Sequence, residues 1–159
     1  MKENAYKLLN DLEIPFQTVQ HPPLFTCQDA QKYNINFLGC TEAKNLLLRN
    51  SNKSNYYLVI LSLHKRADLK GLQESLKETK LSFADEETLF EKLKVKIGAA
   101  SLLNVANIEK TDVRVLVDKD LLQSKTVGFH PSDNTETLVF ASKEIQRILD
   151  YKKVIWQFV

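Results

Sequence analysis

The chain has 159 residues, of which 43% are hydrophobic and 26% are charged, and its formal net charge at pH 7 is +2. A chain of this length can bury about two thirds of its unfolded surface without disulfide or metal staples, so we expect one domain over residues 1–159. No apolar run approaches the roughly 20 residues that cross a bilayer, and the first residues lack the apolar core of a secretory signal. The composition therefore predicts a cytoplasmic protein without membrane contact.

The first third of the chain predicts a helix, a short strand and a second helix. Residues 3–12 carry apolar side chains at helical spacing, which predicts an amphipathic helix. Side chains in residues 16–20 alternate in the pattern of a short strand. The pair of prolines that follows ends the strand, because two backbone N–H donors of the ladder are missing there. Thr26 then stands where an N-cap would begin a helix over 26–33.

The middle of the chain predicts a buried sheet. A leucine run at 46–48 predicts the first central strand, with Lys44 and Asn45 at its mouth. The polar loop 50–55 turns the chain into residues 56–63, the most β-rich stretch. Their near-continuous apolarity predicts a strand covered on both faces and hence a mixed sheet.

Two short helices and a brief strand follow in the pattern. Asp68 predicts the cap of a helix through residue 76, and residues 81–83 predict a brief strand. Acidic residues at 85–87 favour a helix start, where the helix dipole stabilises them. The buried face of this second helix is predicted to consist of Leu89, Phe90 and Leu93.

The last third predicts further strands and one helix. Residues 113–118 form a strand, and residues 126–130 pair with 137–140 as a hairpin across a Pro-Ser-Asp-Asn turn. Ser142 and its neighbours are expected to cap a helix, and residues 154–159 can add a closing strand. The whole pattern predicts an α+β fold, with strands of mixed direction and helices packed outside.

Several polar residues are candidates for chemistry. Lys44 and Asn45 lie beside a buried strand, so their polar groups can be held rigidly toward a phosphate or a carbonyl ligand. His130 stands at a sheet rim, Lys65 and Arg66 are possible phosphate partners, and the amides of the loop that begins at Gly98 could form an anion-binding concavity. Each feature also has an ordinary structural interpretation. Lys44 can be a surface lysine, His130 a histidine at the sheet rim, and Lys65 and Arg66 part of a solvated turn. The small-residue loop by itself is only weak evidence for anion binding.

Several classes of site find no support in the sequence. It has no Gly-x-Ser-x-Gly nucleophile elbow, no spacing that pairs a cysteine with a histidine, and no metal-ligand cluster. Cys27 and Cys40 form neither a zinc motif nor a redox motif, so we read both as free thiols. We expect no cofactor and no metal.

Four ordered motifs carry a resemblance to a known family. They are His21-Pro22-Pro23-Leu24-Phe25-Thr26, the pair Lys44-Asn45, His64-Lys65-Arg66-Ala67-Asp68-Leu69, and Gly128-Phe129-His130-Pro131-Ser132-Asp133-Asn134-Thr135. With these motifs the chain resembles the YbaK/prolyl-tRNA synthetase-associated domains, and most of all the free-standing ProX-type deacylases. The resemblance covers nearly the whole chain.

The resemblance implies a fold and an activity. The fold is an α+β domain with a central mixed, barrel-like sheet surrounded by helices. The activity is hydrolysis of alanine from mischarged proline tRNA, in which a ribose hydroxyl helps to activate water. The implied partner is the acceptor end of that tRNA, prolyl-tRNA synthetase is a candidate second partner, and we expect a monomer.

The resemblance also assigns roles to residues. Those assigned to catalysis are Lys44, Asn45, His130 and Gly98. Those assigned to substrate binding are Phe25, Thr26, Ser101, Gly128 and Phe129, although plain core packing is the preferred reading of Phe129. Those assigned to tRNA binding are Lys44, Lys65 and Arg66. His21 is either a solvated turn residue or part of the wall of the aminoacyl pocket.

One residue departs from the family pattern. Related proteins usually carry proline in the small-residue loop after the glycine, where this chain has Leu102. A looser loop could weaken oxyanion placement or change which amino acid fits. Two alternatives therefore stand beside the main reading: a deacylase of the same fold that acts on cysteinyl-proline tRNA, and a non-catalytic RNA-binding or regulatory module.

Overall fold

The structure is a computed structural model that describes residues 2–23, 41–63, 65–108 and 112–159. The helices in these ranges are α1 (Lys2–Asp11), α3 (Leu69–Leu76), α4 (Glu86–Leu93), α5 (Glu144–Tyr151) and the 3-10 helices η2 (Leu102–Asn107) and η3 (Lys119–Gln123). The strands are β1 (Phe16–Gln20), β2 (Thr41–Arg49), β3 (Tyr56–Ser62), β4 (Ser82–Phe83), β5 (Val113–Val117), β6 (Thr126–Phe129), β7 (Glu136–Ala141) and β8 (Trp156–Phe158). None of the described helices is long and apolar enough to span a bilayer.

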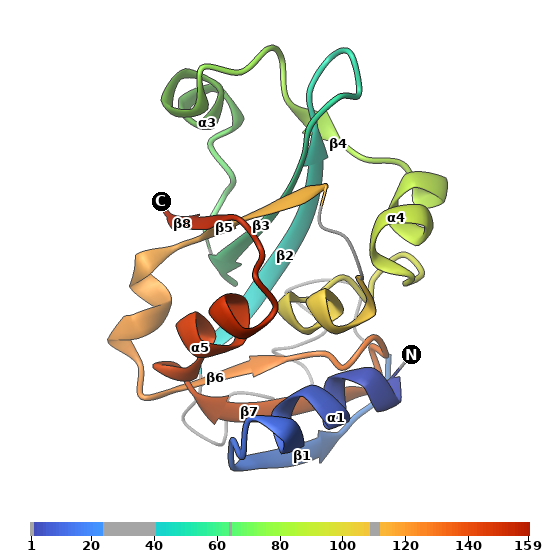
Figure 1. The fold of residues 1–159 in the computed structure, drawn as a ribbon, viewed down its shortest axis with the longest axis vertical. Helices are drawn as coiled ribbons and strands as arrows, with labels where there is room; N and C mark the ends of the chain where they lie inside the picture. The colour runs from blue at the N-terminus through green and yellow to red at the C-terminus, as the bar shows by residue number, and fades with distance from the viewer. Residues whose placement is uncertain (1, 24–40, 64, 109–111) are drawn as a thin grey trace.

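The described strands form one mixed sheet in the order β1-β7-β6-β2-β3-β5-β8 (Figure 1). Strand β2 is antiparallel to β3 along one side, and its other side pairs in parallel with β6 and antiparallel with β4. Strands β1 and β8 stand at the two ends of this order, so the sheet is open rather than closed into a barrel. The α+β class and the mixed sheet agree with the sequence prediction.

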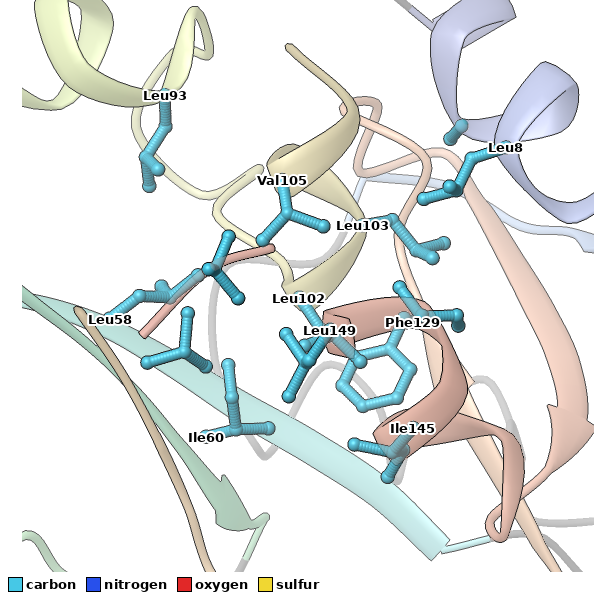
Figure 2. Close-up of a cluster of buried hydrophobic side chains, with 14 of the residues drawn as sticks. Leu8, Leu58, Ile60, Leu93, Leu102, Leu103, Val105, Phe129, Ile145 and Leu149 are labelled. Atoms are coloured by element: carbon cyan, nitrogen blue, oxygen red, sulfur yellow. The ribbon is translucent and has the colours of Figure 1, made fainter. Parts of the chain in front are cut away.

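Two apolar cores lie on opposite faces of the sheet. The larger core packs the sheet against α1, α4, η2 and α5, with Leu58, Ile60, Leu102, Phe129 and Leu149 among its members (Figure 2). The smaller core lies beneath α3 and consists of Leu48, Tyr57, Val59, Leu61, Leu81 and Leu116. Strand β3 feeds both cores by alternation, which confirms that its unbroken apolar run belongs to a strand covered on both faces.

Three details of the sequence prediction are wrong. Phe90 is 54% exposed, because Leu89 and Leu93 are four residues apart on one helical face and Phe90 lies about 100° away from Leu89. Strand β2 begins at Thr41, so Lys44 and Asn45 lie within it rather than at its mouth. The N-cap of α5 is Lys143 without a side-chain bond, while the Ser142 hydroxyl donates to the carbonyl of Ser124. The predicted helix over 26–33 lies outside the described residues.

A network around Glu78 joins the β2–β3 hairpin to the loop after α3. Its carboxylate accepts hydrogen bonds from the Tyr57 hydroxyl at 2.6 Å and from the side-chain amides of Asn55 and Asn50 at 2.9 and 3.0 Å. The bond from Tyr57 is the largest cause that lowers the pKa of Glu78 to about 2, and burial raises the pKa of Tyr57 to about 12. The folded protein therefore favours the ionised carboxylate.

We expect Glu78→Gln to lower the free energy of unfolding by about 1–3 kcal/mol at pH 7, because it replaces a charged acceptor that receives three hydrogen bonds in a partly buried network. The stabilisation by Glu78 is complete above its ordinary pKa of 4.5 and is lost as the pH falls toward about 2. Urea unfolding of both proteins should show the difference narrowing over that interval. Glu74→Gln on the exposed side of α3 is the control, and an equal effect there would contradict the assignment.

Candidate active site

The sheet brings Lys44 and His130 to one face. Strands β2 and β6 run parallel with Glu42 beside Gly128, and Lys44 and His130 each follow two residues later. Side chains alternate along a strand, and Leu47 and Phe129 belong to the larger core, so Lys44 and His130 both lie on the face away from it. A residue from early in the chain and one from late in the chain therefore lie on the same face, each two residues beyond the last pair of the β2–β6 ladder.

Lys44 is partly buried and its ammonium group is held in place. The ammonium donates a hydrogen bond to the backbone carbonyl of Lys65, in the turn that follows β3. A lysine ammonium has three donor hydrogens, so this bond leaves two for a ligand. Lys44 can therefore present a fixed positive charge on its face of the sheet.

His130 is positioned as a neutral base. Its Nδ1 lies 2.9 Å from the backbone carbonyl of Glu136, which can only accept a hydrogen bond, so Nδ1 carries the hydrogen. Burial is the main cause that lowers the pKa of His130 below the ordinary 6.5. At neutral pH the ring is therefore uncharged, and its Nε2 offers a lone pair to a water molecule or a hydroxyl group.

His21 stands beside His130, a proximity that sequence reasoning missed. The centroids of the two rings are 5.8 Å apart. The Nε2 of His21 lies 2.7 Å from the Thr137 hydroxyl, and its Nδ1 lies 2.9 Å from the Pro22 carbonyl. The pairing of β1 with β7 creates this contact across more than 100 residues of chain, so no local pattern could reveal it.

Asn45 does not share the face of Lys44. As the next residue in the strand it points the other way, toward η2, and its side-chain oxygen accepts a hydrogen bond of 2.9 Å from the amide of Leu102. Because an amide N–H can only donate, this bond orients the Asn45 side chain. Asn45 therefore holds the first turn of η2 against β2. It does so between the residues of β2 that pair with β6 and those that pair with β4.

The loop after Gly98 is tightly held. Gly98 adopts a φ of 86°, which favours glycine, and the fully buried Ser101 caps η2 in a reciprocal capping box with Asn104. The amides of residues 101–104 all donate within the protein, so they are not available to an oxyanion. The side chain of Leu102 is buried in the larger core, so core packing and the hydrogen bonds of residues 101–104 together fix the position of this loop.

A serine in the hairpin turn connects the loop to the His130 segment. The Ser132 hydroxyl accepts hydrogen bonds from the side-chain amides of Asn104 at 2.9 Å and Asn107 at 3.1 Å. Ser132 has a φ of 65°, a conformation that these bonds help to hold. Sequence reasoning treated Ser132 as turn chemistry alone and did not identify Asn104 or Asn107.

The remaining predicted residues fall into three groups. Phe129 is 2% exposed and stacks on Phe140 with ring centroids 5.7 Å apart, which supports core packing rather than substrate contact. Gly128 is buried within β6, where it pairs with Val139 of β7. Phe25 and Thr26 lie outside the described residues.

The charged groups of Lys65 and Arg66 lie in different surroundings. The Lys65 ammonium lies 2.9 Å from a carboxylate oxygen of Asp118 and 2.5 Å from one of Asp120, and these bonds raise the pKa of Lys65. Arg66 is exposed. In this turn the charge of Lys65 is matched by carboxylates, whereas the Arg66 guanidinium is accessible to a phosphate.

Comparisons with known proteins agree with this fold and identify a family. The family model for the aminoacyl-tRNA editing domain matches residues 21–148. The prolyl-tRNA editing protein ProX of Acetoanaerobium sticklandii is 34% identical over 148 residues, which cover 93% of this chain and 90% of that protein. The prolyl-tRNA synthetase associated domain-containing protein 1 of Mus musculus is 34% identical over 134 residues, covering 82% of this chain and 78% of that protein.

A solved structure shows the same fold. The crystal structure of a candidate trans-editing enzyme for prolyl tRNA synthetase superposes with a TM-score of 0.73 at 18% identity, covering 99% of this chain and 94% of that one. At this identity the likeness concerns the fold alone. The family match and the ProX relative go further, because they span most of the chain at the level of sequence. The chain belongs to the aminoacyl-tRNA editing domain family, and as a member of it is an aminoacyl-tRNA deacylase.

Proposed function

We propose that this chain removes alanine from mischarged proline tRNA by hydrolysing the ester at the acceptor end. The observation that supports the proposal is that Lys44 and His130 lie on the same face of the sheet, each two residues beyond the pair Glu42–Gly128. The relationship to a prolyl-tRNA editing protein supports proline tRNA as the substrate.

The proposed chemistry needs a positioned base and a fixed cation. Water adds to the ester carbonyl, and the ribose oxygen leaves with a proton. The unprotonated Nε2 of His130 accepts a hydrogen bond from the water or from a neighbouring ribose hydroxyl and so orients the attacking group. The Lys44 ammonium stabilises negative charge, either on the terminal phosphate or on the oxygen that becomes the oxyanion. RNA supplies part of the reactivity, so no strong protein nucleophile is needed.

Selectivity follows from size. A synthetase pocket built for proline rejects a smaller side chain by only ~1–3 kcal/mol, which leaves errors for a second site to remove. A site that admits alanine and excludes the proline ring would release the wrong amino acid and protect the correct product.

The test is deacylation of purified proline tRNA charged separately with alanine, cysteine and proline, with and without added prolyl-tRNA synthetase. We expect release of alanine well above the uncatalysed rate and no release of proline. Faster release of cysteine than of alanine would replace the proposed substrate with cysteinyl-proline tRNA. Tight binding of the tRNA without turnover would overturn the proposal in favour of a non-catalytic module.

A further inference from the structure

A buried carboxylate lies behind the turn that holds Lys44. Asp118 follows β5 and is only 2% exposed. Its carboxylate accepts hydrogen bonds from the amide of Asp120 at 3.0 Å, from the amide of Ser62 at 3.3 Å and from the Lys65 ammonium at 2.9 Å. The end of β3, the end of β5 and the turn after β3 therefore meet at this one side chain.

The charge on Asp118 is retained in the folded protein. Burial alone would raise the pKa of Asp118, but the bonds from Lys65 and from the two amides outweigh it and lower the pKa. An ionised carboxylate away from water strongly favours keeping its cationic partner. The Lys65 side chain is consequently held between Asp118 and Asp120, although 44% of that side chain is exposed.

The main chain of Lys65 transmits this restraint to the site. The Lys65 amide donates to the carbonyl of Ser62 at 3.0 Å, and its own carbonyl accepts the hydrogen bond from the Lys44 ammonium. Lys44 is itself fixed in register opposite Leu61 on β3. A continuous set of contacts thus runs from the buried carboxylate through one lysine to the ammonium of another.

We propose that Asp118 is a positioning residue for Lys44, acting through Lys65, whose side chain anchors the turn and whose carbonyl aims the Lys44 ammonium. The inference rests on the proposed function for the role of Lys44 in deacylation. It also assigns different roles to the two cationic side chains of this turn. Lys65 serves the geometry of the site, and Arg66 remains to contact an RNA phosphate.

The experiment observes Lys44 directly. In protein labelled with 15N at lysine, a hydrogen-bonded ammonium gives a 1H–15N signal in the cold because its protons exchange slowly, and Lys44→Arg assigns that signal by removing it. We expect Asp118→Asn and Lys65→Met each to shift or abolish the Lys44 signal and to lower kcat by about tenfold, with a smaller change in KM. Asp112→Asn is the matched control, because it removes a carboxylate from Lys92 at the opposite end of β5.

The double variant Asp118→Asn/Lys65→Met separates positioning from stability. Lys65→Met alone leaves a buried carboxylate without its cation, whereas the double variant removes both charges and should recover much of the lost thermal stability. We expect the Lys44 signal and kcat to stay as perturbed as in the single variants, without an additive loss. A double variant that regained both with its stability would overturn the proposal, as would single variants that leave the Lys44 signal unchanged.

The result can be told apart from a failure of the proposed function. The Lys44 signal needs no turnover, so its loss in Asp118→Asn would support the positioning role even if the wild-type protein released no amino acid. The division of tasks has its own readout in the salt dependence of tRNA binding. Arg66→Gln should reduce the slope by about one phosphate contact, and Lys65→Met should not. A reduced slope for Lys65→Met would overturn that division.

Discussion

Replacing Lys44 by methionine is expected to lower kcat for release of alanine from proline tRNA by about 100- to 1,000-fold, the range found when one oxyanion donor is removed. Methionine keeps much of the length and the apolar stem of lysine, so the fold should persist while the charge is lost. Single-turnover deacylation at saturating protein measures the effect on the chemical step apart from binding.

Two further variants sharpen the Lys44 result. Lys44→Arg keeps the positive charge but replaces a point charge by a planar fork, so partial activity is expected. Lys70→Met removes an exposed lysine from α3 and should change the rate by no more than about twofold. If Lys44→Met retained wild-type turnover, the assignment of the cation would be wrong whatever the substrate.

Replacing His130 by glutamine is expected to lower kcat by about 100- to 10,000-fold, the range of positioned acid–base groups. The wild-type rate should rise with pH through an inflection below 6.5, because burial lowers the pKa of His130 and only the neutral ring has a free Nε2. Above that inflection the rate should no longer change with the protonation of His130. The profile of the His130→Gln variant should lack the inflection.

His21→Gln is the matched control for this profile. His21 lies beside His130, and a positive charge on it disfavours protonation of His130. Its removal should therefore move the inflection to higher pH instead of abolishing it. Other charged groups act on the same ring, since Asp133 in the hairpin turn raises the pKa of His130. A profile of the His130→Gln variant that kept the wild-type inflection would exclude His130 as the titrating group.

Local patterns predicted the elements and failed at long-range pairings. The apolar run of β3, the Asp68 cap and the helical spacing of Leu89 and Leu93 are written in neighbouring residues, and the structure confirms them. The prediction that Phe90 is buried is wrong because three apolar residues close in sequence do not all share one helical face. The opposite directions of Lys44 and Asn45 follow from strand alternation once the true start of β2 is known.

The contacts that define the site lie beyond such reasoning. His21 meets His130 only because β1 pairs with β7, and Lys65 meets Asp118 only because β5 lies parallel beside β3. Both depend on strand order, which distant segments decide by how they bury their apolar faces. The hydrogen bond between Leu102 and Asn45 is of the same kind, because it joins the loop after Gly98 to a strand more than 50 residues earlier in the chain.

The central position of β2 in the sheet affects which parts of the sheet can open locally. This strand pairs with β3 on one side and with both β6 and β4 on the other, so the β2–β3 ladder that carries Lys44 lies away from both ends of the strand order. Fraying at either rim leaves that ladder intact, and only a cooperative opening of the whole sheet releases it. Lys44, the proposed catalytic cation, is thus carried by a strand at the centre of the described sheet, and we expect its position to stay fixed while the tRNA binds and leaves.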